Sequence, residues 1–111
     1  MTDFKNVLVW EKSRELTKDI YELTKKFPKD EINGLTSKIR NTSIEIGSAI
    51  AKGAGRKLKK DFIEQIGIAL SLTYELQSHL ILALDLGYLW NSDIEILTTK
   101  IEEIQKLLDK K

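Results

Sequence analysis

The sequence has 111 residues, of which 41% are hydrophobic, with no cysteine and a formal net charge of +1. This length predicts a single domain with a core of its own, and the lack of cysteine excludes disulfides, thiolate metal sites and a cysteine nucleophile. Apolar residues never run on for about 18 positions, so no membrane span is expected. The first residues lack the basic and apolar regions of a signal peptide, which predicts a cytoplasmic protein.

Charge is distributed unevenly along the chain. Residues 1–60 hold 14 Lys or Arg against 8 Asp or Glu, whereas residues 61–111 hold 4 against 9. Five basic residues and no acidic one lie between Lys52 and Lys60. Such a run can mark an anionic partner, although an exposed turn that is merely solvated is the commoner explanation of a charge run.

The apolar spacing is helical throughout, and it predicts four helices. The first covers residues 8–26 and is stopped by Pro28, because proline disfavours the α conformation in the residue before it. The second covers residues 33–54, with Gly47 in its interior. Glycine inside a helix costs about 1 kcal/mol relative to alanine, which favours close approach of another backbone over simple tolerance. The segment Gly53–Gly55 is expected to end this helix in the left-handed conformation.

The third predicted helix, residues 59–86, carries more apolar residues than one buried stripe needs. One seam consists of Phe62, Ile66, Ala69, Thr73, Leu76, Leu80 and Ala83. Further apolar residues lie off that seam, namely Ile63, Leu70, Leu72, Ile81 and Leu84. Either the helix lies centrally in the fold, or its extra apolar face forms a subunit interface. The pattern leaves both explanations open.

The fourth predicted helix covers residues 93–109 and follows a turn at Gly87–Trp90. Ser92 and Glu95 have the spacing of a capping box at its start. Apolar residues at positions 94, 97, 101, 104 and 108 follow the alternating three- and four-residue steps of a left-handed bundle. Four helices joined by short loops predict an all-α, antiparallel up-down four-helix bundle, a single domain over residues 1–111.

Candidate catalytic or metal-binding residues are few. His79 is the only histidine, and Glu75 precedes it by one helical turn. A lone histidine beside one carboxylate can act as an acid or base, but it is far more often a surface or rim residue. The Glu-x-x-His pairs of di-iron bundles are absent. We therefore expect no catalytic residue, no metal and no cofactor, and hence no enzyme.

The segment Lys52–Lys57 is similar to a phosphate cradle in one respect. Its glycines expose backbone N–H groups, a helix N-terminus follows, and basic side chains surround it. It is not a P-loop, because the GxxxxGK[ST] motif is missing and no strand precedes it. Aromatic residues do not interleave with the basic run, so a stacking platform for single strands is not indicated. The phosphate backbone of folded or duplex nucleic acid is the favoured target.

Several short motifs spread almost from end to end carry a family resemblance. They include Leu8-Val9-Trp10, Phe27-Pro28, Gly34-Leu35-Thr36-Ser37, Gly53 with Gly55-Arg56, and Leu86-Gly87-Tyr88-Leu89. With them the chain resembles the small bacterial four-helix-bundle proteins encoded in intervening sequences of 23S ribosomal RNA genes, the S23 ribosomal protein family. It also resembles a sister branch, the accessory variability determinant of diversity-generating retroelements.

The resemblance implies a homopentamer of bundles. The sister branch is a basic, barrel-like pentamer that binds nucleic acid and its reverse transcriptase, and the ribosomal branch implies binding to structured RNA. The chain departs from the ribosomal branch at Lys52, where that branch typically has glutamate, and at Leu58, where a serine would cap the third helix. The added lysine makes the turn more attractive to phosphate.

Together these observations predict a non-enzymatic, cytoplasmic homo-oligomer, a pentamer by resemblance, that binds nucleic acid as an accessory or scaffold, RNA first. The predicted phosphate contacts are Lys52, Arg56, Lys57, Lys59 and Lys60, with Arg40 and Lys38 as support. The alternative is a protein-interaction scaffold, for example an accessory subunit of a retroelement reverse transcriptase, in which the lysines only keep the protein soluble.

Overall fold

The computed structural model describes residues 3–110, and within them the chain is all-α, as the sequence predicted. Four α-helices carry the fold, and short 3-10 helices precede the first two of them. The elements are η1 Phe4–Asn6, α1 Leu8–Thr24, η2 Lys29–Glu31, α2 Leu35–Ala54, α3 Lys59–Asp85 and α4 Asn91–Asp109. The predicted four-helix bundle is therefore confirmed, with helix ends that differ by one or two residues.

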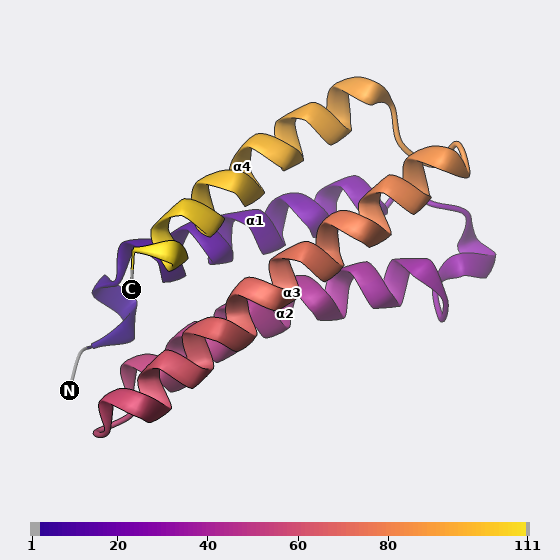
Figure 1. Cartoon of the computed structure of the whole chain (residues 1–111). Coiled ribbons are helices and arrows are strands. Elements are labelled where there is room, and N and C mark those ends of the chain that lie inside the picture. The colour runs from indigo at the N-terminus through magenta and orange to yellow at the C-terminus, as the bar shows by residue number, and fades with distance from the viewer. Residues whose placement is uncertain (1–2, 111) are drawn as a thin grey trace.

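The helices run antiparallel to their neighbours in the chain (Figure 1). α2 packs between α1 and α3, and α4 packs on both α3 and α1, so that the four helices close into a ring. α3 has 27 residues and is therefore about 40 Å long, which accounts for most of the 43 Å length of the molecule. The turn between α2 and α3 lies at the same end of the bundle as η1 and the last turn of α4 (Figure 1).

The core is built from the residues that the helical spacing singled out. Its largest fully buried side chains include Leu16, Ile20, Ile39, Ile46, Leu76, Leu80, Ile101 and Ile104. One polar group inside the bundle, the Gln105 amide, donates to the Thr73 hydroxyl at 3.1 Å and to the side-chain Oε1 of Gln77 at 2.8 Å. The apolar seam of α3 thus packs against α4 with one polar link at its centre.

Helix ends show where local signals were interpreted correctly and where they were not. α1 ends at Thr24 because the chain tightens before Pro28, and the Phe27 N–H donates three residues back, to Thr24. The prediction of a left-handed glycine at the end of α2 was wrong. Gly55 has a φ of −86° and its N–H bonds to the Ala51 carbonyl, so the helix simply continues into it. Gly87, after α3, is the glycine with a positive φ of 81°.

The predicted capping box at Ser92 and Glu95 was also wrong. α4 begins at Asn91, and the carboxylate that reaches back is that of Asp93, which accepts from the Trp90 N–H at 3.0 Å. The same carboxylate accepts at 2.8 Å from Nζ of Lys26, which lies just beyond the end of α1. This contact with Lys26 lowers the pKa of Asp93, and the Trp90 N–H lowers it further. Because α4 begins earlier than predicted, Asp93 and not Glu95 is the third residue after the N-cap residue Trp90.

Gly47 confirms the prediction of close packing. A Cβ at this position would lie 3.1 Å from the Ser13 hydroxyl and 3.7 Å from the Trp10 indole nitrogen, both on α1. Ser13 itself is 1% exposed and donates to the Trp10 carbonyl. The glycine therefore lets α1 and α2 approach each other, which offsets its poor helix propensity.

α3 is one member of the ring, buried along its seam and exposed along the opposite face. Its off-seam residues Ile63 and Ile81 are 50% and 55% exposed, and Tyr74 on the same face is 55% exposed. By length and composition alone α3 could also cross a membrane, since an 18-residue window of it has a mean hydropathy of 1.2. In this structure 33% of that window is buried against the other helices. In this fold it is a core helix of a compact globule, which is compatible with a soluble protein.

Candidate nucleic-acid interface

The five basic residues Lys52, Arg56, Lys57, Lys59 and Lys60, named here the basic turn, lie together where α2 ends and α3 begins. All five side chains are exposed. The ion pairs of the described chain all involve α1 or the two residues after it, and the partners lie in α1 or α4. None of them includes a residue of the basic turn, so its charges are free to meet an anion.

The backbone at the start of α3 adds hydrogen-bond donors to this surface. Leu58 is the N-cap residue, and it offers no side-chain acceptor. The first N–H groups with a partner are those of Asp61 and Phe62, which donate to the Leu58 carbonyl. The N–H groups of Lys59 and Lys60 find no acceptor among residues 3–110. Free N–H groups and the positive end of a helix dipole attract anions.

A cavity of about 320 Å³ opens beside the basic turn. Its floor is apolar and consists of Val7, Val9, Ile50, Ala54, Phe62 and Ile66. Its rim contains Arg56, Lys57, Leu58 and Lys59. Leu58 is 61% exposed there. The cavity therefore combines apolar walls with a cationic edge.

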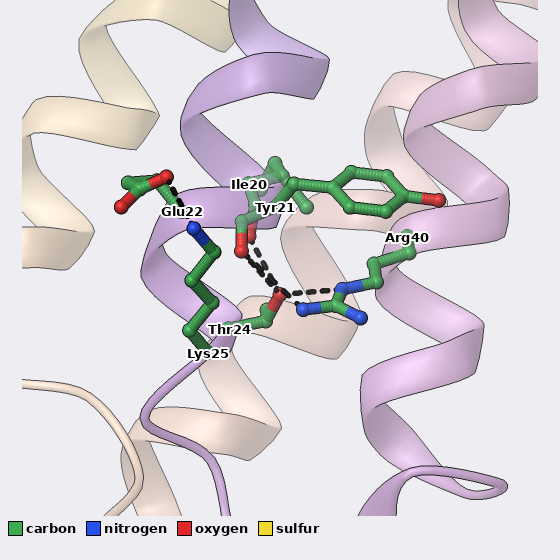
Figure 2. A network of polar contacts seen from close by, with 6 residues as sticks. All are labelled: Ile20, Tyr21, Glu22, Thr24, Lys25 and Arg40. Carbon is green, nitrogen blue, oxygen red and sulfur yellow. Dashed lines mark hydrogen bonds and ion pairs between the residues drawn. The ribbon is translucent and has the colours of Figure 1, made fainter.

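Arg40 and Lys38 do not belong to this surface. They lie near the start of α2, and Lys52 follows Arg40 by twelve residues, which is about 18 Å along a helix. Arg40 is also engaged within the fold (Figure 2): its Nε donates to Thr24 Oγ1 at 2.8 Å, and its Nη2 to the Tyr21 carbonyl at 3.3 Å. Its guanidinium lies 4.6 Å from the centre of the Tyr21 ring. The structure thus brings five of the seven predicted residues together.

A second polar contact joins loops at the opposite end of the bundle from the basic turn. Glu31 accepts from the Leu35 N–H at 3.1 Å and from the Tyr88 hydroxyl at 2.8 Å. These two bonds lower the pKa of Glu31, the backbone bond contributing most. The same contact raises the pKa of Tyr88. No sequence signal predicted it, because the two side chains are 57 residues apart.

Comparison with known proteins identifies the family. The family model of the 23S rRNA-intervening sequence protein matches residues 5–110. The chain belongs to this family. A solved structure of a protein of unknown function from the S23 ribosomal protein family of Bacteroides thetaiotaomicron is similar, with 26% identity and a TM-score of 0.80 over 91% of this chain and 94% of that one. No curated protein matches the sequence.

In this member of the 23S rRNA-intervening sequence protein family, His79 and Glu75 do not form the acid/base pair that their spacing allows. Glu75 accepts from the Thr42 hydroxyl at 3.4 Å, and the buried Nδ1 of His79 has no partner. Residues 3–110 hold no group of three or more acidic or histidine side chains placed to bind a metal ion. The basic turn and its cavity are therefore the best-developed candidate site in the described chain.

Proposed function

We propose that the protein is a non-enzymatic accessory or scaffold protein of the cytoplasm that forms a homo-oligomer and binds nucleic acid. We propose further that it binds structured RNA through the basic turn. The observation that carries the proposal is the set of five exposed basic side chains without an ion-pair partner in the described chain. Such groups release counterions when they meet phosphates, which drives binding without regard to base sequence.

The exposed apolar face of α3 supports the oligomer. Ile63, Tyr74 and Ile81 follow one line along the helix and are each at least half exposed, and contiguous exposed apolar surface marks interaction sites. A groove between α1 and α2, lined by Trp10 and Ile44 among others, would receive such a face from a neighbouring copy. Closed symmetry then repeats the basic turn on each subunit, and a pentamer presents it five times.

The test is binding of a fluorescent, structured RNA across a salt series. Five phosphate contacts per RNA-bound subunit predict a slope of log K against log salt of about −4 to −5. The double variant Arg56→Ala, Lys57→Ala should reduce the magnitude of that slope by about 2 and weaken binding to different RNA sequences alike.

A matched control is the double variant Lys25→Ala, Lys29→Ala. It removes the same amount of charge from the opposite end of the bundle, where Lys25 makes only an exposed ion pair with Glu22. The control should bind like the wild type. An equal loss of RNA affinity in both double variants would show that binding depends on net charge and not on the basic turn. If the wild-type protein does not bind RNA at low salt, the proposal is overturned.

The second candidate function is a protein-interaction scaffold that binds, for example, a reverse transcriptase and no nucleic acid. The exposed face of α3 is the observation that favours it. The double variant Arg56→Ala, Lys57→Ala separates the two functions. Under the scaffold hypothesis it leaves partner binding intact, whereas under the proposed function it weakens RNA binding. Light scattering of the purified chain tests the oligomer that both candidates share.

A further inference from the structure

The cavity beside the basic turn has a chemical character that phosphate binding alone does not use. A surface that only neutralises phosphates needs exposed cations, and the basic turn supplies them. Here three of the cations, Arg56, Lys57 and Lys59, border a hollow whose other lining residues are apolar, Phe62 among them. Leu58, in the middle of the basic run, is 61% exposed at the rim. An apolar group that lies next to an anion would fit both features.

We propose that this cavity receives one unpaired nucleobase of a bound RNA, while the phosphates on either side of that nucleotide rest on the basic turn. The inference rests on the proposed function and specifies its ligand. Nucleic acid supplies both chemistries in one unit, because each base has an apolar π-face and is flanked by two phosphates. Unpaired bases of bulges and loops are the parts of RNA that can be splayed out and stacked on aromatic side chains.

The size of the cavity supports a single small group. Its volume of about 320 Å³ is at the lower end of the range of small-molecule pockets, about 300–1,000 Å³. Phe62 lies one turn into α3, directly after the basic run, with its ring against Gly53. A side chain at Gly53 would lie 3.2 Å from Gln65 and 3.6 Å from the Phe62 ring. Glycine therefore keeps α2 close to the first turns of α3, where the cavity is formed.

The donors at the rim place the phosphates. The free N–H groups of Lys59 and Lys60 lie at the uncapped start of α3, beside the side chains of Arg56 and Lys57. The floor side chains carry no hydrogen-bonding group, so the base would be held by stacking and burial rather than by its edges. We therefore expect a preference for an unpaired base with little preference for its identity.

The experiment compares two RNA duplexes that differ only in one bulged nucleotide, an adenosine in one and an abasic ribose in the other. Both carry the same number of phosphates, so the electrostatic contribution is equal. The wild-type protein should bind the bulged adenosine more tightly by on the order of tenfold, since stacking of one base on an aromatic side chain is worth about that. The slope of log K against log salt should be the same for the two duplexes.

Filling the cavity should remove the preference. Ala54→Leu places extra carbon atoms on the floor of the cavity. The variant should bind the bulged-adenosine duplex only as tightly as the wild type binds the abasic duplex, and its affinity for the abasic duplex should be unchanged. Because Ala54 is 8% exposed, circular dichroism must confirm the fold. Val7→Phe, which fills the cavity from its half-buried N-terminal side, serves as the second variant.

The outcomes separate the two proposals. Equal binding of both duplexes by the wild type, with a steep salt slope, overturns the base pocket and leaves phosphate binding at the basic turn standing. An adenosine preference that survives in both filled variants also overturns the pocket. Failure to bind either duplex at low salt overturns the proposed function, and the inference with it.

Discussion

Replacement of Arg40 by alanine separates a structural arginine from a phosphate-binding one. The sequence predicted Arg40 as a supporting phosphate contact, whereas the structure places its side chain between α1 and α2 (Figure 2). There its Nε donates to the buried Thr24 hydroxyl, which in turn donates to the Ile20 carbonyl at 2.7 Å. We expect Arg40→Ala to destabilise the fold and to leave RNA binding unchanged.

The magnitude follows from the contacts. A hydrogen bond to a charged group contributes about 1.5–3 kcal/mol, and the lower end applies here because the Arg40 side chain is half-buried. The guanidinium over Tyr21, which is 39% exposed, adds about 0.5 kcal/mol. Thr24 keeps its bond to Ile20 after the change, so no buried donor loses its partner. The expected loss is about 2 kcal/mol of the free energy of unfolding.

Urea unfolding monitored by circular dichroism measures this loss. With an m-value of about 2 kcal/mol/M, the midpoint should fall by about 1 M at a fixed protein concentration, which must be held constant because oligomerisation shifts midpoints. Lys38→Ala is the control: Lys38 is exposed on the same helix, and its loss should change stability by less than about 0.5 kcal/mol. If Arg40→Ala leaves the midpoint unchanged but lowers the salt slope of RNA binding, then Arg40 contacts phosphate and the structural argument is wrong.

Three further predictions concern stability. Leu76 is 0% exposed, so Leu76→Ala should lower the unfolding free energy by about 2–5 kcal/mol in urea titrations. Gly87→Ala should lower the unfolding free energy by about 1–2 kcal/mol, because its φ is 81° and alanine is strained there although no atom crowds a Cβ. Gly67 is equally uncrowded but lies inside α3, so Gly67→Ala should raise the unfolding free energy by about 0.5–1 kcal/mol. Equal effects of the two variants would contradict the argument from backbone conformation. The lowered pKa of Glu31 stabilises the fold above its ordinary value of 4.5, and this stability is lost as the pH falls through the lower folded pKa. The raised pKa of Tyr88 stabilises the fold below its ordinary value of 10.0, and this stability is lost as the pH rises through the higher folded pKa. Tyr88→Phe should therefore flatten the alkaline limb of a plot of melting temperature against pH and leave most of the acid limb, because the Leu35 N–H still donates to Glu31.

The contacts that join helices were the part of the fold that sequence reasoning missed. Asp93 replaced Glu95 as the carboxylate that reaches back at α4, because α4 begins at Asn91 with Trp90 as its N-cap residue. Gly55 was expected to take a left-handed conformation, but α2 ends at Ala54 and Gly55 keeps right-handed helical angles, with its N–H bonded to the preceding turn. Both errors concern choices between near-equal local conformations at the end of a helix.

At the candidate site, too, local features were predictable from the sequence and contacts between helices were not. The basic run was visible as a sequence feature, and its residues stay together because they all lie within residues 52–60, where α2 ends and α3 begins. The aromatic wall of the cavity was missed, since Phe62 was assigned to the apolar seam of α3 and not compared with the charges before it. Conversely, Arg40 was grouped with the basic turn by charge alone, although helix geometry places it at the other end of α2.

The sequence by itself determined four helices, their approximate ends, most of the core and one uninterrupted run of positive charge. These are local properties, because the period of the helix and the conformational limits of proline act over a few residues. Only the tertiary structure decided which polar groups meet, such as Gln105 with Thr73 and Tyr88 with Glu31, and that an apolar cavity opens beside the basic turn. Those features depend on the relative height and rotation of packed helices, which result from the fit of whole apolar faces and are not encoded in the spacing along any one of them.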